Sequence, residues 1–161
     1  MKYLFLAVSS FLAIVAQMIA GNNFFLFNFL DLSLILIAYW AIYRSRTEAL
    51  FVGSLTGILL DAAFGWPLGY NGFSKTLAAF AIGQAAKHFN VDGFGVRFAL
   101  ITAASFLSSL TVSGLFSLLQ NHTSNLYLET SLIQSLITGL VGVLMLSLLD
   151  GYQKTQVNRT G

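Results

Sequence analysis

Serines are the residues in this chain best suited to nucleophilic chemistry, because cysteine is absent. Four of them recur at four-residue spacing within one apolar stretch: Ser105, Ser109, Ser113 and Ser117. A serine nucleophile needs a base such as histidine or lysine within reach, but the two histidines, His88 and His122, fall in different loops. A metal site needs several clustered ligands. We therefore predict no catalytic residue, no metal site and no cofactor.

Three ionisable residues fall in or beside apolar stretches, where a charge is costly and normally has a partner or a water-filled pocket. Asp61 ends the apolar run 57–60, and Lys75 lies near the start of the next apolar stretch. We predict that these two residues pair, the alternative being a solvated Asp61 at the membrane interface. Asp31 is expected to open a helix, where its carboxylate favours the positive end of the helix dipole. The residues before it, 24–30, would then form an interfacial lead-in.

Small residues accompany these charges. Gly53, Gly57 and Asp61 recur every four residues, so they share one face of a helix. Glycines at this spacing let a second helix approach closely, either inside the bundle or from a partner protein. A tight turn is expected next, because glycines and one proline follow at once. The predicted packing or partner face comprises Asp31, Gly53, Gly57, Asp61, Gly65, Pro67, Gly69 and Lys75.

The composition indicates that lipid surrounds most of the chain. Hydrophobic residues make up 57% of the 161 residues, charged residues 9%, and the mean hydropathy is +0.78. A soluble domain carries about 25% charged residues, so this chain could not cover a water-facing surface of its size. The dispersed basic residues and the net charge of +2 do not suggest nucleic-acid binding.

The predicted fold is an all-α integral membrane protein with six transmembrane helices in a single polytopic domain, residues 1–161. A membrane-spanning helix needs about 20 mostly apolar residues. The expected spans are 3–20, 24–43, 47–64, 72–87, 96–119 and 127–149. The first has a poor cleavage pattern for a signal peptide, which favours an uncleaved helix. The connections are too short for a soluble catalytic domain.

The distribution of positive charge predicts the orientation. Seven of the eight basic residues fall on one side of the six-span arrangement: Lys2, Arg44, Arg46, Lys87, Arg97, Lys154 and Arg159. The opposite side holds Lys75. Because lysine and arginine accumulate in cytoplasmic loops, both termini are expected in the cytoplasm.

The stretch from Asp31 to His88 resembles the MreD family of bacterial rod shape-determining membrane proteins. Members typically open their second helix with an acidic residue or asparagine, as Asp31 would, and end it with a Tyr-Trp-like pair, here at 39–40. A third helix with the pattern G-x-x-x-G-x-x-x-D follows, matched by 53–61, and then a G-x-x-L-G turn, matched by 65–69. The chain departs from the family at Leu30, where proline is frequent.

This resemblance implies a non-enzymatic scaffold of the elongation machinery, which organises lateral peptidoglycan synthesis and maintains rod shape. The implied partners are the bitopic membrane protein MreC and, indirectly, MreB filaments, RodA and a class B penicillin-binding transpeptidase, in the bacterial cytoplasmic membrane. The family fold is similar to the substrate-binding membrane subunit of energy-coupling-factor vitamin transporters, which supplies the alternative function. An intramembrane enzyme, the third possibility, lacks paired catalytic groups.

Overall fold

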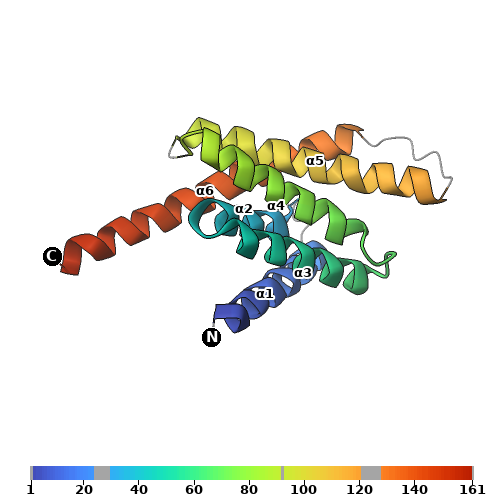
Figure 1. Cartoon of the computed structure of the whole chain (residues 1–161), viewed down its shortest axis with the longest axis horizontal. Coiled ribbons are helices and arrows are strands. Elements are labelled where there is room, and N and C mark those ends of the chain that lie inside the picture. The colour runs from blue at the N-terminus through green and yellow to red at the C-terminus, as the bar shows by residue number, and fades with distance from the viewer. Residues whose placement is uncertain (1, 24–29, 92, 121–127, 161) are drawn as a thin grey trace.

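The computed structural model describes residues 2–23, 30–91, 93–120 and 128–160, and within them all regular structure is helical. The helices are α1 (Lys2–Asn23), α2 (Leu32–Tyr43), α3 (Arg46–Phe64), α4 (Tyr70–His88), α5 (Phe94–Gln120) and α6 (Leu128–Thr160) (Figure 1). The all-α prediction is confirmed. Among the described residues, α3, α5 and α6 are long and apolar enough to cross a membrane, and shorter apolar segments cover 10–19 and 32–43. Six crossings therefore remain a prediction.

The two ends of the bundle differ in character. We call the end that carries the α3–α4 connection the turn end, on the right in Figure 1. The opposite end carries the α2–α3 and α4–α5 connections, and we call it the basic end because Arg44, Arg46, Lys87 and Arg97 lie there. Helix α6 continues away from the other helices at the basic end (Figure 1).

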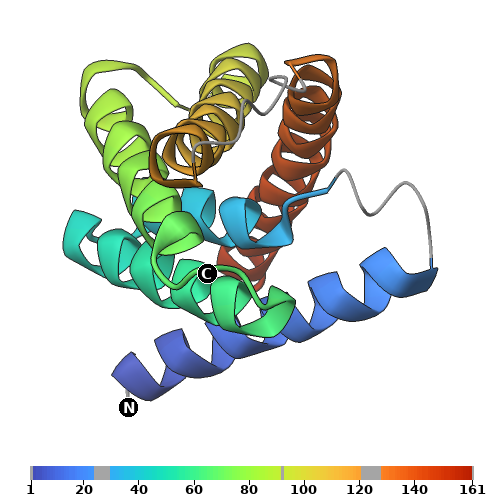
Figure 2. The same ribbon diagram turned by 90° about the vertical axis from the view of Figure 1, so that its right-hand side faces the viewer.

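Helix α2 occupies the centre of the bundle, where it contacts all five other helices (Figure 2). A helix that is hydrophobic on every side is normally buried, and seven of the 12 residues of α2 are buried. Twelve residues extend only about 18 Å, against a hydrocarbon core of about 30 Å. The described part of the expected span 24–43 is therefore too short to cross a membrane alone, and residues 24–29 lie outside the described residues.

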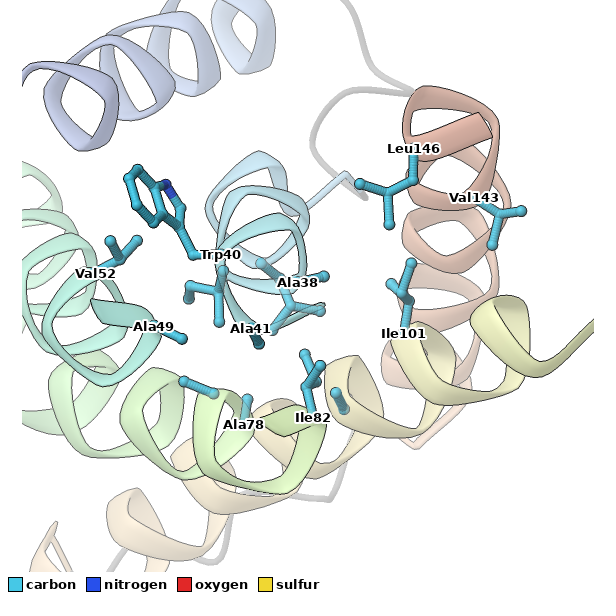
Figure 3. Close-up of a cluster of buried hydrophobic side chains, with 14 residues drawn as sticks. Ala38, Trp40, Ala41, Ala49, Val52, Ala78, Ile82, Ile101, Val143 and Leu146 are labelled. Carbon is cyan, nitrogen blue, oxygen red and sulfur yellow. The ribbon is translucent and has the colours of Figure 1, made fainter. Parts of the chain in front are cut away.

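The hydrophobic core is built around α2 from side chains of neighbouring helices (Figure 3). Trp40 is the largest fully buried side chain. Around α2 the core comprises Ala49 and Val52 of α3, Ala78, Ala79 and Ile82 of α4, Ile101 and Ala104 of α5, and Val143 and Leu146 of α6. Several of these residues are alanines, so the helices pack at short distance around α2.

Helices α3 and α4 form the hairpin that holds most of the predicted site. The Ser45 hydroxyl caps α3 by accepting a hydrogen bond from the backbone N–H of Glu48 at 3.3 Å. Gly65 ends α3 with a φ of 67°, and Gly69 precedes α4 with a φ of 105°. Residues that carry a side chain rarely adopt this left-handed backbone conformation, so both positions favour glycine. The two glycines thus turn the chain back on itself within a few residues.

Candidate functional site

A buried ion pair joins α2 to α4. The Lys75 Nζ binds the Asp31 Oδ2, and both side chains are almost fully enclosed. Asp31 is also the N-cap of α2: its Oδ1 accepts hydrogen bonds from the Leu34 N–H at 3.0 Å and from the Ser33 hydroxyl at 2.6 Å. The carboxylate thus meets both a positive side chain and the positive end of a helix dipole. Its expected place at the start of a helix is observed.

This ion pair lies deep inside the bundle. The Asp31 N–H donates to the Thr138 Oγ1 of α6 at 3.2 Å. Thr138 follows the start of α6 by ten residues, which is about 15 Å along the helix axis. The Ser33 N–H donates to the Gln17 Oε1 of α1 at 3.4 Å. The start of α2 is therefore tied to α1, α4 and α6 near half the height of the long helices.

The predicted pair between Asp61 and Lys75 is wrong. Asp61 is fully buried, and its carboxylate accepts four hydrogen bonds from the chain around the start of α4. The donors are the Gly69 N–H at 2.8 Å, the Asn71 N–H at 3.1 Å, the Asn71 Nδ2 at 2.9 Å and the Gly72 N–H at 3.4 Å. The N-terminus of α4 supplies the positive potential that the predicted pairing assigns to Lys75. The alternative of a solvated Asp61 is wrong for the same reason.

Asp61 also fixes the turn between α3 and α4. Its backbone carbonyl accepts a hydrogen bond from the Trp66 N–H at 2.9 Å, while its side chain holds the far side of the turn. Trp66 and Tyr70 both make edge-to-face contacts with Phe116 of α5, with ring centroids 5.4 and 4.7 Å apart. Leu68, between these two anchors, is 71% exposed, and Trp66 itself remains 43% exposed. The result is a fixed backbone that presents apolar side chains.

The glycines of α3 face α4. A Cβ atom at Gly53 would lie 2.8 Å from the backbone oxygen of Lys75, and one at Gly57 would lie 2.5 Å from the Cα of Gly72. Neither position has room for a side chain, because the nearest atoms belong to the backbone of α4, which cannot move aside as a flexible side chain could. The glycine spacing allowed contact with a helix of the bundle or with a partner protein, and the structure shows contact with α4 of the bundle. Gly65 and Gly69 have open space around them, and Pro67 is exposed.

The sequence interpretation missed a second charged cluster, at the basic end. The Arg97 Nη1 of α5 binds the Asp150 Oδ2 of α6 at 2.5 Å, and the Tyr43 hydroxyl of α2 donates to the Asp150 Oδ1 at 2.5 Å. Arg97 also donates through Nε to the Val91 carbonyl. The signal in the sequence was an acidic residue at the end of one apolar stretch and a basic residue at the start of another. The distribution of basic residues uses Arg97 for the orientation alone and does not predict this contact.

The serine run of α5 is divided between environments. Ser105 and Ser108 are buried, whereas Ser117 is exposed. The hydroxyls of Ser74 and Ser108 are 2.6 Å apart and join α4 to α5. The four-residue spacing of the serines therefore does not predict which of them are buried.

Asp31, Asp61, Lys75 and Arg97 are buried, and each binds a charged side chain or a helix terminus, so their evident role is to tie helices together. No group of three potential metal ligands occurs within the described ranges. The charged groups accordingly fix the relative position of five helices: α2 to α4 through Lys75, α3 to α4 through Asp61, and α2, α5 and α6 through Asp150.

The long apolar helices and the internally paired charges define a helical membrane protein. A family profile described as rod shape-determining protein MreD matches residues 1–152. The chain belongs to the MreD family. Membership gives it a role in the determination of cell shape, in a family that is not known for enzymatic activity. No curated protein and no solved structure matches the chain.

Proposed function

We propose that this protein is a non-enzymatic scaffold that organises lateral peptidoglycan synthesis together with an MreC-like bitopic partner. Through that partner it would connect to MreB-type filaments, RodA and a class B penicillin-binding transpeptidase. The observation that carries the proposal is the family match over residues 1–152, joined to a bundle whose buried charges are used in contacts between helices. A scaffold must keep its surfaces in fixed relation, and such contacts serve this purpose.

The proposal includes six crossings of the cytoplasmic membrane with both termini in the cytoplasm. The basic end would face the cytoplasm, and α2 would form the inner half of the second crossing. Arg44 and Lys87 are exposed at that end, as the positive-inside rule requires, whereas Lys75 is enclosed by its ion pair.

Reporter fusions test this topology. Fusions after Tyr70 and after Asn125 should report an extracytoplasmic position. Fusions after Arg46, after Asn90 and at Gly161 should report a cytoplasmic one. A cytoplasmic signal at Tyr70 would contradict the arrangement, because it would put the turn end on the wrong side.

The tip of the α3–α4 turn is the surface that we assign to the partner. Gly53 and Gly57 are occupied by α4, so they have no free face to offer. The tip is exposed and apolar, and its backbone is already fixed by Asp61. A surface that is ordered before binding loses less conformational entropy when a partner docks. This turn therefore combines the two properties that a small contact site needs.

Co-purification with the MreC-like partner tests the assignment. Leu68→Asp should abolish recovery of the partner while leaving the folded yield unchanged, because Leu68 is exposed. Leu148→Asp, at a leucine of α6 that is 75% exposed and lies toward the basic end, is the matched control and should retain the partner. Full recovery of the partner with Leu68→Asp would exclude the turn as the contact.

Depletion from a rod-shaped host tests the function itself. Cells should widen and become round, while transpeptidase activity and vitamin uptake stay normal. The transporter alternative predicts cells of normal width whose growth requires a vitamin supplement. That second outcome would overturn the proposed scaffold.

A further inference from the structure

An apolar groove runs between α4 and α5 on the surface of the bundle. Its volume is about 520 Å³. Most lining residues are small: Ala81, Ala85, Gly95, Ala99, Ala103 and Ala104, with Ile82, Phe89, Val96, Leu100 and Leu107 completing the walls. Ala99 and Ala103 are exposed along its floor. The groove begins at the basic end, where α4 finishes and α5 starts.

The length of the groove distinguishes between possible occupants. On α5 it extends from Gly95 to Leu107, which is about 18 Å along the helix. Directly beyond Leu107, the hydroxyl contact between Ser74 and Ser108 holds α4 against α5. A transmembrane helix would need a groove of about 30 Å, whereas one leaflet of the hydrocarbon core is about 15 Å deep. The groove therefore matches one acyl chain in one leaflet.

The open end of the groove favours a negative headgroup. Lys87 and His88 form the last turn of α4 and are exposed. The first N–H groups of α5 lack partners within the helix and attract anions, and a Cβ at Gly95 would meet no heavy atom within 4 Å. Asp92, in the same connection, lies outside the described residues.

We infer that the α4–α5 groove binds an anionic phospholipid, with one acyl chain along Ala99 and Ala103 and the phosphate between Lys87 and the start of α5. The site is separate from the proposed partner surface, which lies at the turn end. The assignment to the cytoplasmic leaflet rests on the proposed topology, but the binding itself does not.

Native mass spectrometry of the purified full-length chain tests the inference. The protein is equilibrated with vesicles of phosphatidylglycerol or of phosphatidylcholine with the same acyl chains. The wild type should retain one phosphatidylglycerol that the double variant A99L/A103L lacks. Lys87→Ala should weaken retention about five-fold, the effect of one lysine near a charged membrane surface. The double variant A62L/A63L adds the same volume to an exposed face of α3 and should bind as the wild type does.

Three results would overturn the inference. One is equal retention of phosphatidylglycerol and phosphatidylcholine by the wild type, which needs no variant to fold. Another is undiminished retention by a folded A99L/A103L. The last is the loss of a co-purifying membrane protein from A99L/A103L while the amount of bound lipid stays unchanged. That result would identify the groove as a docking site for a helix. Normal partner recovery with lost lipid would separate this site from the scaffold contact.

Discussion

The ion pair between Asp31 and Lys75 gives the sharpest test of the structure. Asp31→Asn removes the charge but keeps a good N-cap residue for α2. It leaves the Lys75 ammonium buried without its partner, and breaking a buried pair in this way costs about 3–5 kcal/mol. Lys75→Met should cost less, because Asp31 keeps the Ser33 hydroxyl, the Leu34 N–H and the helix dipole. The double variant should recover part of the loss caused by Asp31→Asn, since a neutral pair needs no compensation.

The free energy of unfolding, measured by titration with a denaturing detergent, provides the assay. Asp31 and Lys75 should show a coupling energy of about 2 kcal/mol, within the range for directly interacting residues. Asp61→Asn combined with Lys75→Met is the control and should be additive, because Asp61 binds the start of α4. Coupling of Lys75 to Asp61 but not to Asp31 would refute the reasoning.

The remaining predictions concern packing and the basic end. Gly57→Ala should destabilise the protein by about 1–3 kcal/mol, because the added Cβ meets the backbone of Gly72 and the helices must separate. The control Ala62→Leu, on the exposed face of α3, should cost little. Equal losses of stability in the two variants would contradict this prediction. Asp150→Asn should cost about 1–3 kcal/mol in the same assay, less than Asp31→Asn, because its side chain is 26% exposed and Arg97 keeps the Val91 carbonyl. A larger loss than for Asp31→Asn would reverse this ranking.

The helices could be predicted from the sequence where local signals determine them. The expected span 47–64 and the observed α3 differ by one residue, because Ser45 supplies an N-cap and Gly65 a left-handed end. Asp31 was expected to open a helix and does so. These features depend on neighbouring residues, and the corresponding sequence signals are strong.

The partner of Lys75 could not be predicted in the same way. Asp61 is close to Lys75 in sequence, whereas Asp31 is 44 residues away. Which carboxylate binds Lys75 depends on which one already accepts enough hydrogen bonds from backbone N–H groups. The geometry of the α3–α4 turn gives those hydrogen bonds to Asp61. The central position of α2 could not be predicted either, because an apolar sequence is compatible both with a helix that faces lipid and with one that is buried among other helices.

The burial of α2 has a consequence for biosynthesis. Asp31 enters the membrane with α2, but Lys75 is synthesised 44 residues later, which takes about 2–9 s at ordinary translation rates. During that interval α2 is too short to cross the bilayer alone and has no counter-charge from α4. Its final position can therefore be reached only after the α3–α4 hairpin has been inserted. The ion pair and the packing around α2 can therefore be completed only late in the synthesis of the chain.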